Sequence, residues 1–289
     1  MDIVILGGTG FVGRALSAAL REEGHQVTSY GRKLFESDTA LTNALNQQSV
    51  LIMLNGANIG QRWSDAYKRE LWRSRIDVAG QVQRALSRCD QPPQRIFCTS
   101  AIGLYPQNTC NQPHTEACTD VDSSFLGELG QAWEQASLSL TPSPTILRFG
   151  VVLGKNGGAL AKMLPAFKLG LGGPIAGGKQ CFSWIHIEDL INAYRFLLAN
   201  PHLNGTFNLT SPNPLSQADF GRALAQTLHR PFWLPMPKWQ LKLMFGEGAQ
   251  VLTHSSAVIP ERLIQAGFSF CHANIHDALY NLLNTNLIK

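Results

Sequence analysis

The sequence predicts an α/β fold: a Rossmann-like, doubly wound parallel sheet with a smaller, α-rich C-terminal domain. Two observations lead to this prediction. Short apolar strands alternate with amphipathic helices along the first 150 residues, and a glycine-rich turn separates the first strand from the first helix. Strands that alternate with helices indicate parallel pairing, because a parallel strand is reached through a crossover connection that is usually a helix.

The elements follow in order from the N-terminus. Residues 3–6 form a β-branched apolar run typical of a buried parallel strand, and apolar side chains recur at helical spacing after Phe11. Gly24 is placed to end this helix. We expect further strands at residues 26–30, 50–54, 95–99, 145–149 and 207–209, and helices at residues 64–88, 125–139, 187–199, 216–228 and through most of 239–289. The short stretch between residues 30 and 50 indicates a trimmed βα unit.

The domain boundary is expected near residue 150, where the composition changes. Glycine is frequent in residues 154–178, so we expect an irregular segment laid over the edge of the sheet. We assign residues 1–150 to a Rossmann domain, to which residues 186–200 return. Residues 151–289 form the smaller substrate and C-terminal domain.

Composition excludes several classes of protein. The 289 residues carry a net charge of +4 without a basic run, so we expect no nucleic-acid partner. Hydrophobic residues make up 44% of the chain, which excludes intrinsic disorder. No apolar stretch is long enough to span a membrane, and Met1 leads into a strand rather than a targeting leader. We therefore expect a cytoplasmic protein with no membrane partner.

The six cysteines predict neither a zinc site nor a disulfide framework. They form no CxxC pair and no Cys/His cluster with metal-ligand spacing, so we expect no metal and reduced, mostly buried thiols. Cys110 and Cys118 share a loop and could oxidise together, but no base stands near them in the sequence. We expect both to stay reduced.

The glycine-rich turn predicts a dinucleotide site. Its run is Gly7-Gly8-Thr9-Gly10-Phe11-Val12-Gly13, which fits both GxGxxG and GxxGxxG. The turn needs positive φ, the backbone must approach a pyrophosphate, and the helix that follows supplies free N–H groups. We expect cofactor contacts from Gly7, Thr9, Gly10, Phe11, Val12 and Gly13. The alternative is a glycine-rich turn that binds no ligand.

The end of the second strand indicates the cofactor. An NAD site uses Asp or Glu there to bind the ribose, whereas this chain has Gly31, Arg32 and Lys33. An arginine fork clamps a 2′-phosphate, so we predict NADP(H). The alternative is that Arg32 and Lys33 are solvated loop charges.

Several motifs together resemble one family. They are GGTGFVG (7–13), KRELWRSRI (68–76), SAIGLY (100–105), RFGVVLG (148–154), GGALAKMLPAFKLGLGGP (157–174) and SWIHIED (183–189). They cover nearly the whole chain and resemble the extended short-chain dehydrogenase/reductases. The similarity is greater to an atypical branch called the epimerase family, whose small C-terminal domain has no defined function.

The resemblance implies a Rossmann-like fold and more cofactor contacts. Gly31 and Arg32 would meet the adenosine phosphate, Leu54, Asn55 and Gly56 the ribose, and Val152 the nicotinamide end, while Glu70 and Arg75 would also face the cofactor. The family usually reads Asn-Leu-Ala-Gly where this chain has residues 53–56 as Met-Leu-Asn-Gly. This departure affects the expected contact of Asn55.

The usual catalytic residues are absent. Short-chain enzymes use Tyr-x-x-x-Lys, in which Lys lowers the pKa of Tyr so that Tyr exchanges a proton with substrate. When Glu134 is placed on the extended family's glutamate, Leu126 and Gly130 take the Tyr and Lys positions. Ala101 takes the Ser/Thr position. An enzyme on this scaffold must therefore recruit other groups.

Ser100, Tyr105 and His186 are the candidate catalytic residues. Each has a structural alternative: Ser100 caps a strand end, Tyr105 packs in the core, and the titratable His186 hydrogen-bonds at a helix start. Arg148 either binds an anion or pairs with a buried acid. We expect Glu116 to be structural.

Two functions of different classes remain open. The first is an NADP(H)-dependent oxidoreductase or epimerase that acts on an unknown small polar substrate, with a sugar nucleotide as the candidate. The second is a non-catalytic NADP(H)-binding sensor or partner-binding regulator, since family members often carry the label of cell-division inhibitor. The absent Tyr/Lys pair favours the second function, and the cleft elements favour the first, which we prefer. A monomer and a homodimer are both open.

Overall fold

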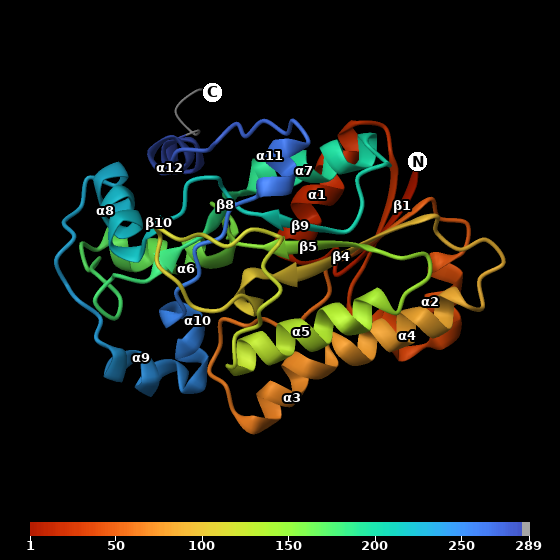
Figure 1. The fold of residues 1–289 in the computed structure, drawn as a ribbon, viewed down its shortest axis with the longest axis horizontal. Helices are drawn as coiled ribbons and strands as arrows, with labels where there is room; N and C mark the ends of the chain where they lie inside the picture. Colours follow the sequence, from red (N-terminus) through yellow and green to blue (C-terminus); the bar gives the residue numbers. More distant parts are fainter. Residues whose placement is uncertain (285–289) are drawn as a thin grey trace.

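The computed structural model describes residues 1–284 and is built on a six-stranded sheet (Figure 1). Its strands are β1 (Asp2–Leu6), β2 (Gln26–Tyr30), β3 (Val50–Met53), β4 (Arg95–Ala101), β5 (Thr145–Phe149) and β9 (Thr206–Leu209). They are all parallel, in the order β2-β1-β3-β4-β5-β9. The order reverses at β1, and ligands of doubly wound sheets bind at the carboxyl ends of strands beside such a reversal.

Helices cover both faces of the sheet. The helices α1 (Phe11–Glu22), α7 (Ile187–Ala199) and α11 (Glu261–Gln265) lie over one face, and α2 (Asp38–Leu45), α3 (Asp65–Arg73), α4 (Ile76–Leu86) and α5 (Phe125–Leu138) lie on the other side (Figure 1). Alternate residues of β1 enter different apolar cores, with Ile3 and Ile5 in one and Val4 and Leu6 in the other. A strand covered on both faces is therefore apolar throughout, which is the signal that the sequence carries.

A smaller layer packs beyond β5. The strand β6 (Val151–Gly154) pairs in parallel with β8 (Trp184–His186), and β7 (Cys181–Phe182) pairs antiparallel with β10 (Leu215–Ser216). The helices α6 (Gly158–Lys168), α8 (Gln217–Thr227) and α12 (Ile275–Asn284) enclose a third apolar core. Short elements complete the chain: η1 (Arg32–Glu36), η2 (Ile102–Leu104), α9 (Lys238–Phe245), η3 (Glu247–Ala249) and α10 (Gln250–Thr253). Residues 285–289 of the expected C-terminal helical region lie outside the described residues.

Two expectations about elements were wrong. The unit between β2 and β3 is not trimmed, because η1 and α2 fill it, and the Ser37 side chain caps α2 by accepting from the Ala40 N–H. The segment expected to be irregular contains the eleven-residue helix α6. Its buried side chains Leu160, Leu164 and Phe167 recur at helical spacing, but the flanking glycines and the internal Pro165 obscured that pattern.

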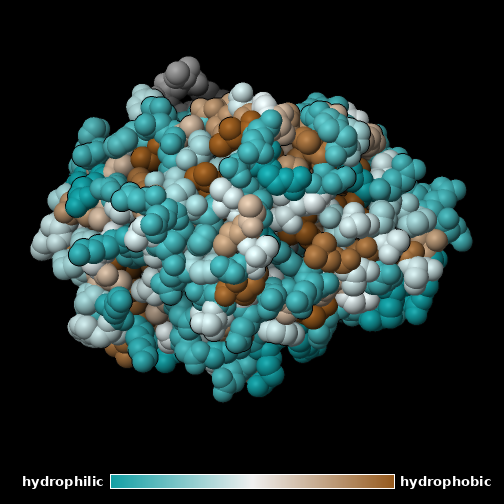
Figure 2. Space-filling model, viewed as in Figure 1, coloured by the Kyte–Doolittle hydropathy of each residue, from teal (hydrophilic) through white to brown (hydrophobic). Residues whose placement is uncertain are grey.

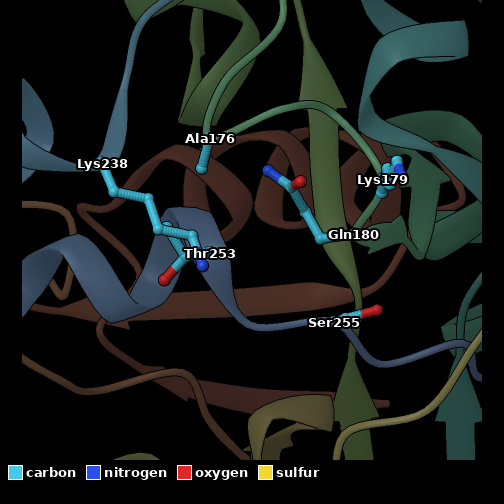
Figure 3. A pocket seen from close by; sticks show the side chains of 6 residues that line it. All are labelled: Ala176, Lys179, Gln180, Lys238, Thr253 and Ser255. Carbon is cyan, nitrogen blue, oxygen red and sulfur yellow. The ribbon is translucent and has the colours of Figure 1, made fainter.

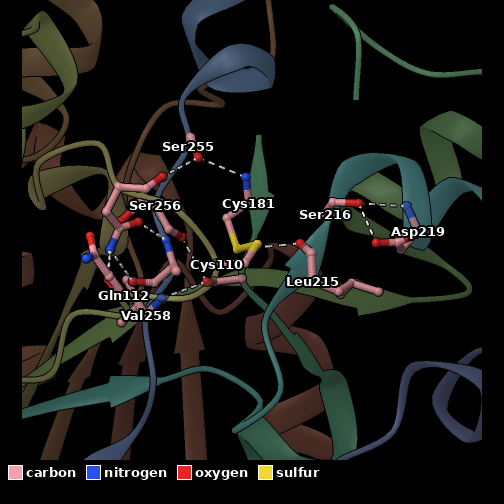
Figure 4. The surroundings of a disulfide bond; sticks show 12 residues. Cys110, Gln112, Cys181, Leu215, Ser216, Asp219, Ser255, Ser256 and Val258 are labelled. Atoms are coloured by element: carbon pink, nitrogen blue, oxygen red, sulfur yellow. Dashed lines mark hydrogen bonds between the residues drawn. A yellow bond between two sulfur atoms is a disulfide. The ribbon is translucent and has the colours of Figure 1, made fainter. Parts of the chain in front are cut away.

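The expectation of reduced cysteines was wrong for two of them. Cys110, in the loop after β4, forms a disulfide with Cys181 of β7, 71 residues away (Figure 4). Cys118, the loop neighbour of Cys110, stays a free thiol, as do Cys89, Cys98 and Cys271. The pairing follows from the docking of the loop on the smaller layer, which brings the two Cα atoms to 5.4 Å. Sequence spacing carries no sign of that docking.

The surface is mixed in character. Figure 2 shows a largely hydrophilic face on which apolar side chains occur in several separate groups. Large exposed apolar side chains include Trp233, Trp239 and Leu243, which belong to the connector before α9 and to α9 itself. Within residues 1–284, no helix has the length and apolar character needed to cross a membrane.

Candidate functional site

The glycine-rich turn joins β1 to α1 and is fastened to the end of β2. The N–H groups of Gly7 and Gly8 both donate to the Tyr30 carbonyl, at 2.9 and 3.1 Å, and the Gly10 N–H donates to the Gly7 carbonyl at 3.0 Å. Gly7 has a φ of 81°, a conformation that L side chains rarely adopt. The turn is therefore held by main-chain hydrogen bonds.

Close backbone approach explains the glycines. A Cβ on Gly7 would lie 2.6 Å from the Leu54 carbonyl carbon, and a Cβ on Gly13 would lie 2.6 Å from the Gly7 carbonyl oxygen. The helix α1 then begins with no side-chain cap and no acidic residue in its first turn. Its N-terminal N–H groups and partial positive charge therefore remain available to an anion.

The other residues of the run surround this turn. Thr9 is exposed and contacts Gly31, where an added Cβ would lie 3.2 Å from the Thr9 Oγ1. Phe11 packs against Gly154 at the start of the smaller layer, where an added Cβ would lie 2.3 Å from its ring. Val12 packs on the first apolar core. The run thus joins the sheet edge to the smaller layer.

Arg32 and Lys33 begin η1 just after β2, with Gly31 as its N-cap. Both cations are exposed, and neither forms an ion pair with any described residue. The sequence holds no carboxylate between Tyr30 and Lys33. This geometry fits the predicted 2′-phosphate contact, and it also fits solvated charges.

The turn after β3 is held by its neighbours. The Asn55 Nδ2 donates to the Ser74 carbonyl at 3.0 Å, while its Oδ1 is buried and accepts no hydrogen bond from the described residues. Leu54 packs on the first core, and an added Cβ on Gly56 would lie 3.1 Å from the Arg75 guanidinium carbon. The orphaned Asn55 oxygen is a group that a ribose hydroxyl would satisfy.

Arg75 is buried next to the turn after β3. Only 7% of it is exposed, and its guanidinium donates to the carbonyls of Leu71 at 3.1 Å and Ala57 at 3.2 Å. It lies over the Trp133 ring, and burial lowers the pKa of Arg75 to about 10. Arg75 therefore supports the turn after β3, and its contact with a cofactor stays a prediction.

Two more predicted contacts have less definite surroundings. Glu70 is half-buried on α3 and belongs to none of the ion pairs found in residues 1–284. Val152 lies on β6, is paired with Ile185 and is partly buried against the first core. Their contacts with a cofactor stay predictions.

A buried ion pair closes the end of β4. Arg148 on β5 grips Glu134 on α5 through two hydrogen bonds of 2.7 Å, and the Ser100 Oγ donates to the same carboxylate at 2.6 Å. Burial alone would lower the pKa of Arg148, but the hydrogen bonds and charge of Glu134 outweigh it and raise the pKa. Arg148 is thus a partner of a buried acid, one of the two alternatives left open for it.

Tyr105 extends this network. Its side chain has no exposed surface, its hydroxyl donates to the Asn208 Oδ1 at 2.9 Å, and it accepts from Arg148 at 2.7 Å. Burial raises the pKa of Tyr105, against the opposing charge of Arg148. Glu116 completes the chain of contacts by accepting from the main-chain N–H groups of Asn208 and Arg262.

The surroundings of Ser100 and Tyr105 favour the structural alternatives over the predicted catalytic roles. Both hydroxyls are buried, and they donate their hydrogen bonds to the side chains of Glu134 and Asn208. The Tyr and Lys positions beside them are also filled by packing, since Leu126 is buried and an added Cβ on Gly130 would lie 3.2 Å from the Leu104 Cβ. The place that the catalytic Tyr and Lys of short-chain enzymes would occupy, at Leu126 and Gly130, is thus filled by packed side chains. We call it the closed corner.

His186 is likewise a structural residue. It is 2% exposed and caps α7, with its Nδ1 accepting from the Glu188 N–H at 3.1 Å. Burial lowers its pKa to about 4, and its ring lies against His272, whose Nε2 is 3.0 Å from the Glu188 carboxylate. The three side chains offer ligand atoms within 4.8 Å of one another. However, an Nδ1 that accepts a hydrogen bond leaves the proton on Nε2, so His186 is not a ready metal ligand.

Two cavities lie beyond the carboxyl edge, beneath the short C-terminal helices. The first, of about 350 Å³, is lined by Ala176, Lys179, Gln180, Lys238, Thr253 and Ser255 (Figure 3). The second, of about 460 Å³, shares Lys238 and Thr253 with the first and is also lined by Ser124, Lys242, Glu247 and His254. Sequence reasoning missed these residues. The only local signal was the Lys238–Lys242 spacing on one helix.

Comparisons with known proteins agree with this arrangement. Residues 3–210 match the model of the NAD dependent epimerase/dehydratase family, and residues 236–282 match a domain of unknown function (DUF1731). The chain is 34% identical over 294 residues to Epimerase family protein SDR39U1 of Bos taurus, a match that covers 98% of this chain and 100% of that protein.

Solved structures show the same relationship. The crystal structure of human epimerase family protein SDR39U1 (isoform2) with NADPH has a TM-score of 0.90 at 29% identity and covers 98% of this chain and 99% of that one. A nucleoside-diphosphate sugar epimerase from Corynebacterium glutamicum has a TM-score of 0.78 at 26% identity, covering 98% of this chain and 58% of that one. The chain belongs to the NAD dependent epimerase/dehydratase family.

Proposed function

We propose that this protein binds NADP(H) at the carboxyl ends of β1, β2 and β3 and uses it in an oxidoreductase or epimerase reaction on a small polar substrate. The observation that carries the proposal is the uncapped N-terminus of α1 beside the exposed Arg32 and Lys33. Both features suit phosphate groups. The NADPH in the human relative supports the same cofactor.

Several residues would hold the cofactor. The N–H groups at the start of α1 would bind the pyrophosphate, Arg32 the 2′-phosphate, and the orphaned Asn55 Oδ1 a ribose hydroxyl. When bound, NADP(H) supplies hydride-transfer chemistry. The buried Glu134–Arg148 pair keeps α5 and β5 fixed beside that edge.

A proton must move in such a reaction, and His254 is suited to carry it. It lines the second cavity, and its Nε2 lies 3.2 Å from the Tyr105 carbonyl, which only accepts hydrogen bonds. The proton is therefore on Nε2, and no hydrogen bond to Nδ1 is found among residues 1–284, so its lone pair can accept a proton. Burial lowers the pKa of His254, which favours the neutral imidazole, the form that can accept a proton.

A sugar nucleotide is the substrate we favour. The Corynebacterium relative is described as a nucleoside-diphosphate sugar epimerase, and the two adjoining cavities have room for a ligand of that class. The alternative function is a non-catalytic NADP(H) sensor or partner-binding regulator. The closed corner at Leu126 and Gly130 favours that alternative.

Turnover with a panel of nucleoside diphosphate sugars separates the two functions. We expect NADPH oxidation or epimer formation with at least one sugar. The kcat of His254→Ala should fall about 100-fold, as general acid–base catalysis implies. The exposed His202→Ala is the matched control and should keep full activity. Absence of both reactions in a protein that binds NADPH would contradict the enzyme proposal and support the sensor.

A further inference from the structure

The helix α9 presents three different faces. Leu241 is fully buried against the body of the protein, and Trp239 and Leu243 are exposed to solvent, at 66% and 68%. Lys238 and Lys242 lie one turn apart and line the cavities described above. The helix therefore places two exposed lysines along the lining of these cavities.

Positive charge at these cavities is not balanced by the protein. Lys179 adds a third ammonium group at the first cavity, next to Gln180 (Figure 3). None of Lys179, Lys238 and Lys242 forms an ion pair with a residue in the described range. The carboxylate that lines the second cavity, Glu247, is paired with Lys68 of α3. The net charge facing the cavities is positive.

The walls between these lysines are fixed. Gln180 Nε2 donates to the Ile175 carbonyl at 3.0 Å and to the Leu252 carbonyl at 3.1 Å. Ser255 Oγ donates to the Asn108 carbonyl at 2.7 Å and accepts from the Cys181 N–H at 2.9 Å. The Cys110–Cys181 disulfide ties the same wall to the loop after β4 (Figure 4). The Gln180 amide and the Ser255 hydroxyl therefore already donate to protein carbonyls, and the lysines supply the positive charge for an anionic ligand.

We propose that the two adjoining cavities form an anion site for a phosphate ester or diphosphate, with Lys238 at its centre and Lys179 and Lys242 on either side. Lys238 and Thr253 line both cavities, and Lys238 is the cation of the two, so a diphosphate placed beside it would lie near Lys179 in the first cavity and Lys242 in the second. The site is separate from the turn after β1. Its role as a substrate site rests on the proposed function, but anion binding itself does not.

The test is a calorimetric titration with inorganic pyrophosphate at low salt. We expect Lys238→Ala to weaken binding about tenfold or more, as the loss of a charge-assisted hydrogen bond implies, and Lys238→Arg to retain most of it. Lys168→Ala, which removes an exposed lysine at the end of α6, is the matched control and should bind as the unchanged protein does. Added salt should weaken binding.

Pyrophosphate also resembles part of a dinucleotide, so Arg32→Ala is titrated in parallel. Binding that is lost in Lys238→Ala and kept in Arg32→Ala supports the proposal. Binding that is kept in Lys238→Ala, or lost only in Arg32→Ala, overturns it. The NADPH affinity of Lys238→Ala, measured separately, shows whether the proposed cofactor site fails independently. Adenosine diphosphate and glucose 6-phosphate then distinguish a diphosphate from a monoester ligand.

Discussion

The two halves of the sheet's carboxyl edge differ in how exposed their polar groups are. After β1, the chain enters α1, whose N-terminal N–H groups have no side-chain cap. After β2, the cations Arg32 and Lys33 are exposed. After β4, the side chains of Ser100, Glu134 and Arg148 satisfy one another and are almost fully buried, at 1%, 9% and 9% exposure. One half is open to a ligand, and the other is part of the core.

The difference shows that cofactor binding and proton chemistry are separate features of this fold. Cofactor binding depends on backbone geometry, whereas proton transfer needs an accessible titratable side chain. Here α5 packs so closely on η2 that Gly130 has a neighbouring Cβ within 3.2 Å of where its own would be. If the protein is an enzyme, its proton donor must therefore lie beyond this corner, on the side of the cavities.

The closed half should give the largest effect on stability. Glu134→Gln keeps the size of the side chain but leaves Arg148 buried without a negative partner, which should destabilise the protein by about 3 to 5 kcal/mol. Urea unfolding measures this loss, and Glu128→Ala, at an exposed position on the same helix, is the control. A loss below about 1 kcal/mol, the usual value of a surface pair, would show that the corner is open to water.

A smaller effect is expected from pH at the start of α7. Burial lowers the pKa of His186 from its usual 6.5 to about 4, so the unfolded chain takes up the proton first as pH drops. Stability from this residue is complete above pH 6.5 and declines toward pH 4, by about 2 kcal/mol at pH 5. His186→Asn retains a capping side chain and removes the titration.

Unfolding curves at pH 7 and pH 5 measure the change. The difference in unfolding free energy between the two pH values should be smaller in His186→Asn than in the unchanged protein. The exposed His202→Ala should leave the difference unaltered. An equal difference in all three proteins would mean that His186 titrates normally and is not a buried cap.

Local signals in the sequence predicted the open half well. The apolar run of β1 and the Gly7–Gly13 turn both depend on neighbouring residues, and the structure has the strand, the positive φ of Gly7 and the helix in the expected order. The helix expected at residues 216–228 is also present as α8, where the Ser216 side chain caps it by accepting from the Asp219 N–H. Strands, turns and caps can be predicted from the sequence because the residues that form them are close together in the chain.

Contacts between distant segments could not be predicted. Glu134 meets Arg148 only because α5 packs beside β5, and Cys110 meets Cys181 across 71 residues. The first cavity, lined by Lys179 and Lys238, depends on how α9 packs against the smaller layer. Residue spacing and periodicity do not predict such contacts. The sequence therefore could not show that the side chains of Ser100, Tyr105 and His186 form hydrogen bonds with other protein groups.

The most direct test of the open half is the affinity for NADPH and NADH, measured by calorimetry for the unchanged protein and for Arg32→Ala. We expect NADPH to bind more tightly than NADH. We also expect Arg32→Ala to weaken NADPH binding about tenfold, a cost of about 1.4 kcal/mol, and to leave NADH binding unaffected. Arg230→Ala, which removes an exposed arginine after α8, should change neither affinity. Equal affinity for the two nucleotides, or no binding of either, would contradict the account.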